Sequence, residues 1–174
     1  MKPIVKWSGG KKDEIKRFDD LIPTDISTYV EPFFGGGAVF FHVEPKRAVV
    51  SDVHEELIDF YRAIKEGKGE DIHTFLNENP NTDEAYYKVR DQFKVVSPLD
   101  NAKRFFYLRK TCFRGMLRYN KSGKFNIPYG RYKTFNYEEL KDEKYRDVFK
   151  GTEIHKKGFE EIFDMCNDPK DFIF

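Results

Sequence analysis

Residues 29–40 of this chain read Tyr29-Val30-Glu31-Pro32-Phe33-Phe34-Gly35-Gly36-Gly37-Ala38-Val39-Phe40. The pattern predicts a buried strand, a tight glycine turn and then the first turn of a helix. Because glycine has no Cβ and tolerates positive φ, backbone N–H groups in such a turn can approach a ligand closely. Glu31 stands at the end of the strand, where ligands bind in open α/β folds. The stretch therefore predicts an α/β fold with a ligand pocket at this turn.

Short apolar runs alternate with helical patterns on both sides of this stretch, as they do in parallel α/β units. In residues 1–60 we expect a helix at about 11–21, strands near 28–31 and 48–51 with a helix between them, and a helix beginning near 53. After residue 136 we expect a helix near 137–142, a strand near 152–155, a helix near 159–165 and a last strand at 171–174.

The middle of the chain has a different pattern, with apolar residues at helical spacing. We expect helices near 69–78, 83–95 and 99–110, followed by a hairpin turn at Asn120-Lys121-Ser122-Gly123 between aromatic residues. The simplest organisation is a core with a helical insertion. We therefore divide the chain into the N-terminal part of the core (1–60), an insertion (61–135) and a return to the core (136–174).

Composition excludes several classes of protein. Of the 174 residues, 39% are apolar and 17% aromatic, which is enough to fill a core and argues against disorder. Two cysteines, Cys112 and Cys166, without CxxC spacing argue against zinc or redox chemistry, so no metal is expected. The chain has no apolar run of about 18 residues and no signal-peptide pattern. We expect a soluble, cytoplasmic protein.

Two features near the glycine turn suggest a nucleoside ligand. Asp52 lies 17 residues after Gly35, at the end of the second strand, where a carboxylate can bind ribose hydroxyls. It could equally cap the helix that begins at Val53, and both roles could coexist. Phe40 occupies the place of the third glycine of a dinucleotide fingerprint, which disfavours NAD and leaves a nucleoside without a pyrophosphate.

The segment Lys6-Trp7-Ser8-Gly9-Gly10-Lys11 lacks the spacing of a P-loop. An aromatic face followed by a lysine suits a ligand with a planar base and a carboxylate. The alternative is a tryptophan in the core and a lysine in solvent.

Residues 101–135 carry ten basic side chains and no acidic one, with aromatic residues interleaved. Basic side chains neutralise phosphates, and aromatic side chains stack on bases or wedge between them. This segregation of charge favours nucleic-acid binding over a solvated face, which usually mixes both signs. The basic residues are Lys103, Arg104, Arg109, Lys110, Arg114, Arg118, Lys121, Lys124, Arg131 and Lys133.

Taken in order, these motifs resemble the Dam-type (D12 class) DNA adenine-N6 methyltransferases over essentially the whole chain. Residues 6–11 look like the family's methyl-donor motif, 31–40 its glycine-rich motif, Ser51-Asp52 its acidic strand end and 118–132 its target-recognition hairpin. The resemblance implies a Rossmann-like methyltransferase core, S-adenosylmethionine as donor and double-stranded DNA as partner. The family's best-known members methylate adenine in GATC.

The resemblance also implies site residues. The donor-binding set is Trp7, Lys11 and Asp52, with the wall of the pocket formed by Glu31, Phe33, Gly35 and Gly37. Arg118 would read a base edge, and an arginine–guanine pair contributes about 1–3 kcal/mol of discrimination. Phe113, Arg114 and Met116 stand where members often carry Tyr, Asn and Leu, beside the flipped base. The remaining DNA-contacting residues would be Asn120, Lys121, Pro128 and Arg131.

In this family an Asp-Pro-Pro-Tyr motif at the tip of a later strand binds the flipped adenine, which must leave the duplex to reach the methyl group. The motif does not occur here, so no catalytic residue is assigned. Asn167-Asp168-Pro169-Lys170 reads as a turn before the strand 171–174 that should deliver the motif. We therefore expect this chain to be inactive alone. Three explanations for the missing motif are open: a truncated gene, a half-enzyme completed by a second chain, or a sequence that ends early.

Three functions follow from these expectations. The leading one is the donor-binding and DNA-recognition part of a bacterial or viral adenine methyltransferase, with the missing C-terminal half or a cognate restriction endonuclease as further partners. The second is a non-catalytic remnant that binds DNA or donor, which the missing motif favours. The third, an NAD-dependent oxidoreductase, is disfavoured by Phe40 and by the basic segment.

Overall fold

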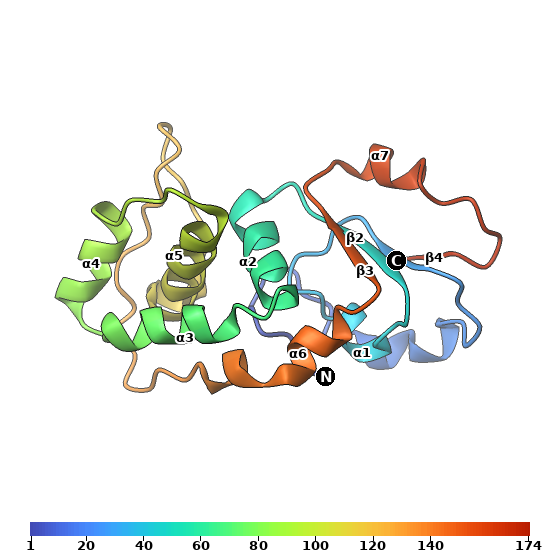
Figure 1. Ribbon diagram of the computed structural model, residues 1–174, viewed down its shortest axis with the longest axis horizontal. Coiled ribbons are helices and arrows are strands. Elements are labelled where there is room, and N and C mark those ends of the chain that lie inside the picture. The colour runs from blue at the N-terminus through green and yellow to red at the C-terminus, as the bar shows by residue number, and fades with distance from the viewer.

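The structure is a computed structural model that describes residues 1–174. A parallel sheet occupies one end of the molecule and a group of helices the other (Figure 1). The sheet has four strands in the order β3-β2-β1-β4, which confirms the predicted α/β class. The strands are β1 (Tyr29–Glu31), β2 (Ala48–Ser51), β3 (Thr152–His155) and β4 (Phe172–Ile173).

Alternate residues of the central strands face opposite sides of the sheet, as the pleat of a strand requires. Tyr29 and Val50 point into the main core, which α1 (Phe40–Val43) and α2 (Glu55–Lys65) cover. Val30 and Val49 point to the other face, where they pack on Ile162 of the short helix α7 (Phe159–Phe163). The α2 face therefore carries most of the apolar burial.

The helical end is continuous with this core. Helix α2 packs along α5 (Pro98–Thr111), and α3 (Gly69–Glu78) and α4 (Asp83–Asp91) pack on the other sides of α5. Two local features favour the start of α5. The Ser97 hydroxyl accepts a hydrogen bond from the Asp100 N–H at 3.1 Å, and proline occupies the first helical position. None of the helices is both long and apolar enough to cross a bilayer.

A hairpin projects from the helical end, with its turn at Asn120–Gly123 as predicted (Figure 1). Its two arms meet at the antiparallel bridges Cys112↔Tyr129 and Tyr119↔Phe125, but they form no regular ladder. At the tip, the Asn120 carboxamide oxygen accepts from the backbone N–H groups of Ser122 and Lys124, both at 3.0 Å. Asn120 therefore holds the turn together.

Two predicted helices were wrong in detail. Residues 11–21 form two 3₁₀ helices, η1 (Ile15–Arg17) and η2 (Asp19–Leu21), because only Ile15 is buried and no apolar face stabilises a full α-helix. Residues 137–142 form a 3₁₀ helix, η4 (Glu138–Lys141). A further helix, α6 (Glu143–Val148), was not predicted; the Asp142 carboxylate caps it by accepting from the Lys144 N–H at 3.0 Å.

The remaining elements agree with the prediction to within a few residues, including α3, β2 and β3 at their predicted bounds. Residues 167–170 form a turn as expected, with the Asp168 carboxylate accepting from the Lys170 N–H at 2.8 Å. A last 3₁₀ turn, η3 (Phe113–Gly115), connects α5 to the hairpin. The strands therefore lie where the apolar runs placed them, and the differences fall in segments with little burial.

Gly69, the first residue of α3, lies at the contact between the insertion and η4, and a substitution there tests this contact. A Cβ at this position would lie 2.0 Å from the carbonyl oxygen of Leu140, so α3 can meet η4 only through a glycine. We expect Gly69→Ala to lower the free energy of unfolding by about 1–3 kcal/mol, because the backbone must move apart. Denaturant unfolding measures this loss.

The control for that substitution is Gly158→Ala. A Cβ at Gly158 meets nothing within 4 Å, and its φ of −70° suits any residue. We expect a smaller loss, below about 1 kcal/mol, because the added Cβ meets no steric barrier and the change only replaces glycine by alanine at the N-cap of α7. Equal losses in both variants would contradict the role of the Gly69 contact.

Candidate functional site

The glycine turn between β1 and α1 is shaped to receive Trp7. Gly35 has a φ of +48°, and a Cβ there would lie 2.6 Å from Cδ1 of Trp7. Only glycine satisfies both the left-handed backbone and the close approach. The N-terminal segment therefore lies directly on the turn, and the half-buried Trp7 ring packs edge-on against His54, with 5.5 Å between the ring centroids.

Glu31 ends β1 as a buried carboxyl group. Its side chain is 5% exposed and accepts a hydrogen bond from the Tyr29 hydroxyl at 2.7 Å. Burial raises the pKa of Glu31 to about 8, and the hydrogen bond from Tyr29 offsets only part of this effect. The neighbouring carboxylate of Asp52 adds to the rise.

Asp52 follows β2 and bonds to two backbone segments. One carboxylate oxygen accepts from the Gly35 N–H and the other from the His54 N–H, each at 2.9 Å. The cap of α2 is His54, whose Nδ1 accepts from the Leu57 N–H at 3.3 Å. The alternative of Asp52 as the direct cap of a helix starting at Val53 is therefore wrong. Each oxygen keeps a lone pair that these bonds do not use.

These groups line one pocket of about 470 Å³ at the carboxyl ends of β1, β2 and β4. Its volume lies in the range of small-molecule sites, and its position is the usual one in an open α/β sheet. The pocket brings together all seven residues predicted to bind the donor, namely Trp7, Lys11, Glu31, Phe33, Gly35, Gly37 and Asp52. Phe174, directly after β4, also lines it and was not predicted.

Phe33, which lines this pocket, packs against Phe159, which lies outside the lining. Phe33, 70% exposed, and Phe159, 41% exposed, have ring centroids 5.5 Å apart. Exposed rings of this kind can hold a planar group by stacking. Phe159 was not among the predicted site residues, although its place just after β3 was a usable signal, because parallel strands end at one edge.

Two further expectations about this region can be compared with the structure. Lys11 lines the pocket but is exposed, with its Nζ 3.6 Å from the Glu14 carboxylate. Phe40 is fully buried and stacks on Phe149 with 5.1 Å between centroids. An aromatic core residue therefore stands where a dinucleotide fold has its third glycine. No group of three His, Cys, Asp or Glu side chains is placed to share a metal ion.

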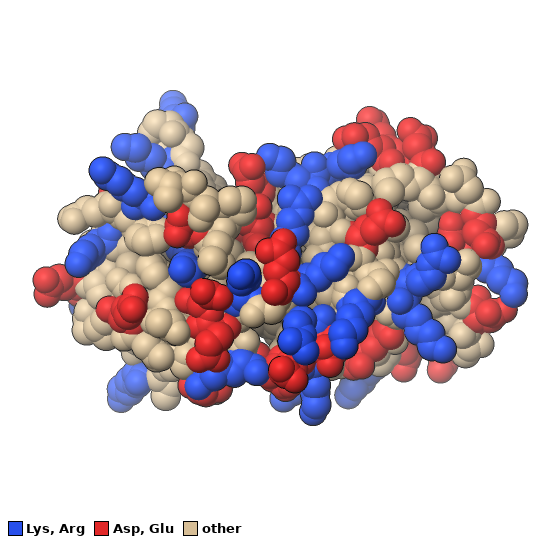
Figure 2. Space-filling model, viewed as in Figure 1, with Lys and Arg blue, Asp and Glu red and all other residues tan.

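The hairpin presents a cluster of exposed side chains. Arg118 donates from Nε to the Asn126 side-chain oxygen at 2.8 Å, which orients the guanidinium and leaves most of its five N–H donors for a partner. Phe113 and Met116 are 44% and 42% exposed. Lys and Arg side chains gather over this hairpin, whereas acidic side chains gather over α7 (Figure 2).

The base of the hairpin has unusual backbone geometry. Arg114 and Arg131 adopt left-handed conformations, with φ of 55° and 52°. Such conformations cost about 1–3 kcal/mol in non-glycine residues and often mark functional positions. The Pro128 carbonyl accepts from the Phe113 N–H at 2.9 Å, so the two arms hold each other there.

Part of the basic segment does not face solvent. Arg104 pairs with Glu56 at 3.3 Å, and Lys110 pairs with Glu139. Arg109 is 7% exposed, donates to the Lys6 carbonyl and lies 5.4 Å from the centre of the Trp7 ring. Burial lowers the pKa of the Arg109 guanidinium.

These three side chains therefore do not belong to the exposed basic face of the segment. The aromatic Phe125 of the same segment is buried as well. The exposed basic residues of the segment are Arg114, Arg118, Lys121, Lys124, Arg131 and Lys133.

Comparison with known proteins gives a family match. Residues 7–174 match the model of the D12 class N6 adenine-specific DNA methyltransferases. The chain is 54% identical over 176 residues to the Type II methyltransferase M.CviBI of Paramecium bursaria Chlorella virus NC1A, with all of this chain and 67% of the relative covered.

Two further relatives are more distant. M.MjaIII, a Type II methyltransferase of Methanocaldococcus jannaschii, is 36% identical, with all of this chain and 68% of the relative covered. The DNA adenine methylase of Escherichia coli K12 is 37% identical over 75% of this chain and 48% of its own length. The chain thus spans about two thirds of the first two relatives and about half of the third.

Glu31 predicts a pH dependence of stability. Its folded-state pKa of about 8 lies above the ordinary value of 4.5, so the folded chain binds more protons than the unfolded chain between these values. Stability contributed by this group is therefore complete below the lower value and is lost as pH rises through the upper one. We expect Glu31→Gln to remove this loss, which is about 4 kcal/mol between pH 5 and 9, as measured by denaturant unfolding.

The matched control is Glu78→Gln, which removes the same charge from an exposed position at the end of α3. It should leave the pH profile of the unfolding free energy parallel to that of the original chain. A Glu31→Gln profile that is also parallel would show that the Glu31 carboxyl does not titrate in this range.

Proposed function

Because this chain belongs to the D12 class of N6 adenine-specific DNA methyltransferases, we propose that it binds S-adenosylmethionine at the glycine turn and double-stranded DNA through the hairpin. The observation that supports this most directly is the convergence of Trp7, Glu31 and Asp52, from three separate elements, on one pocket of about 470 Å³. When bound, S-adenosylmethionine supplies an electrophilic methyl group.

The residues of the pocket fit such a donor. The glycine turn brings the backbone to the wall of the pocket without a Cβ, and Asp52 offers carboxylate lone pairs at the end of β2, where a ribose binds in α/β folds. Phe33 and Phe159 provide aromatic faces for the adenine ring. Lys11 is exposed at the rim and can pair with a carboxylate, in exchange for its loose contact with Glu14.

The exposed side chains of the hairpin suit the recognition of bases and phosphates in a DNA duplex. Arg118 is exposed and oriented by Asn126, as bidentate recognition of guanine requires. Lys121 lies at the exposed tip, where it can neutralise a phosphate. We propose DNA contacts for the whole predicted set, namely Phe113, Arg114, Met116, Arg118, Asn120, Lys121, Pro128 and Arg131. Because the Asn120 oxygen is engaged in the turn, its contact would be made by the NH₂ group.

The proposal extends to the target. The hairpin's likeness to that of GATC-methylating members makes GATC the first sequence to test. Two of the relatives are named Type II methyltransferases, which supports a restriction–modification role with a cognate endonuclease, in the cytoplasm of a bacterial or virus-infected cell.

The division of labour along the chain follows from the same proposal. Residues 1–60 and 136–174 supply the donor-binding core, and residues 61–135 supply DNA recognition, with α2 running through the first boundary. Residues 1–174 contain no Asp-Pro-Pro-Tyr, so we expect donor and DNA binding but no methyl transfer by this chain alone. A binding-only role is the second candidate, and the same absence favours it.

The experiment that separates these functions uses labelled S-adenosylmethionine and a GATC duplex. Binding of donor and duplex without transfer is the expected result. Transfer of label by the chain alone would overturn the expected inactivity, and failure to bind the donor would overturn the proposed function. Competition by NAD would favour the oxidoreductase alternative.

Asp52→Ala tests the donor site. We expect donor affinity to fall roughly 10- to 100-fold, the size of a lost hydrogen bond to a charged group, with DNA affinity unchanged. Asp59→Ala is the control, because Asp59 lies within α2, bonds Asn101 at 2.7 Å and does not line the pocket. Calorimetry measures both variants. Unchanged donor affinity in Asp52→Ala would reduce Asp52 to a structural role.

Arg118→Ala and Lys121→Ala separate base reading from phosphate binding. We expect Arg118→Ala to lose about 1–3 kcal/mol of discrimination between a GATC duplex and a scrambled one. Lys121→Ala should weaken binding to both duplexes equally and reduce the salt dependence by about one phosphate contact. Salt titrations on both duplexes measure these effects. If both variants changed the two affinities alike, Arg118 would have no base-reading role.

A further inference from the structure

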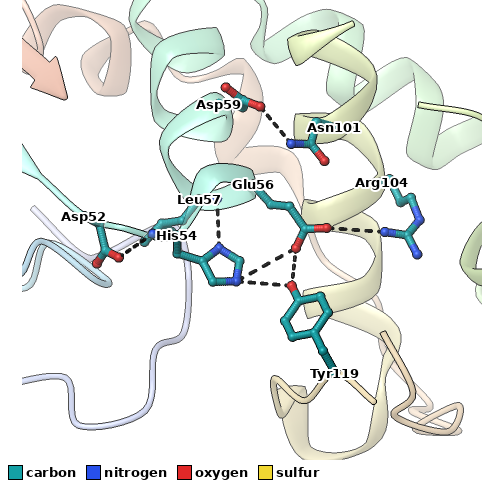
Figure 3. A network of polar contacts seen from close by, with 8 residues as sticks. All are labelled: Asp52, His54, Glu56, Leu57, Asp59, Asn101, Arg104 and Tyr119. Atoms are coloured by element: carbon teal, nitrogen blue, oxygen red, sulfur yellow. Dashed lines mark hydrogen bonds and ion pairs between the residues drawn. The ribbon is translucent and has the colours of Figure 1, made fainter. Parts of the chain in front are cut away.

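A chain of hydrogen bonds joins the donor pocket to the recognition hairpin through the head of α2 (Figure 3). It begins at Asp52, whose two oxygens hold the Gly35 and His54 N–H groups. It continues from the His54 Nε2 to the Tyr119 hydroxyl at 3.1 Å. Tyr119 lies on the hairpin between Arg118 and Asn120, so the pocket and the hairpin share one side-chain connection.

The direction of these bonds is set by His54. Its Nδ1 accepts from the Leu57 N–H, so the proton of the neutral imidazole is on Nε2, which donates to Tyr119. Burial lowers the pKa of His54, in agreement with a neutral ring. The Tyr119 hydroxyl in turn donates to Glu56, and Arg104 holds the other Glu56 oxygen at 3.3 Å. Each member is thereby oriented by the next.

Packing supports the same connection. The His54 ring lies between Trp7, at 5.5 Å, and Tyr119, at 5.9 Å, measured between ring centroids. Tyr119 also packs against Phe125 on the opposite arm of the hairpin, at 5.8 Å. Trp7 lines the donor pocket, so a shift of this ring would press on His54 and through it on the hairpin. The arms hold each other through backbone hydrogen bonds, such as that from the Asn126 N–H to the Arg118 carbonyl at 3.1 Å, whereas the His54–Tyr119 contact ties the hairpin to the start of α2.

We propose that His54 and Tyr119 are positioning residues, which hold the hairpin at a set place relative to the donor pocket and so couple donor binding to base reading by Arg118. This inference rests on the proposed function and goes beyond it, because neither residue need touch donor or DNA. Coupling between two sites requires a connecting element that both ligands bias. The His54–Tyr119 contact is the element that the structure offers.

Tyr119→Phe tests the proposal, because it removes only the hydroxyl and keeps the ring packing. Tyr129→Phe is the matched control: Tyr129 lies in the same segment, but its hydroxyl bonds the Asn81 side chain at 3.0 Å and not α2. For each variant, the affinity ratio of GATC to scrambled duplex is measured with and without S-adenosylmethionine. We expect the donor-dependent gain in this ratio to fall roughly 5-fold in Tyr119→Phe and to remain in Tyr129→Phe.

Hydrogen exchange of the hairpin amides gives a second readout that needs no ligand. In the donor-free chain, we expect Tyr119→Phe to speed exchange at Lys124 and Asn126, and Tyr129→Phe to leave it unchanged. Equal exchange in Tyr119→Phe and the original chain, or a donor effect that survives this substitution, would overturn the positioning role. Failure of the original chain to bind donor or DNA would instead overturn the proposed function, and the exchange comparison would still decide the positioning role.

Discussion

The close approach of Trp7 to Gly35 is the constraint on which the site depends. A Cβ at Gly35 would lie 2.6 Å from the indole ring, so a side chain there would lift the N-terminal segment off the turn. That segment lines one side of the pocket, and the indole ring also meets His54 and the guanidinium of Arg109. The absence of a side chain at Gly35 therefore lets Trp7 form a wall of the pocket, pack against His54 at the start of α2 and cover the buried guanidinium of Arg109.

The two carboxyl groups of the pocket are held in opposite ways. Glu31 is enclosed by the core, and burial outweighs its hydrogen bond from Tyr29, so its pKa rises to about 8. Asp52 lies nearer to solvent and receives two backbone N–H bonds. Neighbouring strand ends thus place two carboxyl groups in one cavity, one enclosed by the core and the other bonded to the backbone of two loops.

Local charge is a weaker guide to function than the position of each side chain. The basic segment contains no acidic residue, yet Arg104 and Lys110 find acidic partners far along the chain, on α2 and η4. Arg109 is buried and packs over the Trp7 ring. What remains exposed gathers around the hairpin, where the left-handed Arg114 and Arg131 shape its base. The candidate DNA surface is therefore smaller and more sharply placed than the run of charges implied.

The sequence by itself determined the strands, most helices and the glycine turn, because apolar periodicity and glycine punctuation act over a few residues. The resemblance to a known family pointed to the seven pocket residues, of which Glu31 and Asp52 were also indicated by their places at the ends of parallel strands. Only the tertiary structure decided the pairing of Phe33 with Phe159, the burial of Arg109 and the link from His54 to Tyr119. Those contacts join positions far apart in the chain, and no local pattern encodes the distance between them.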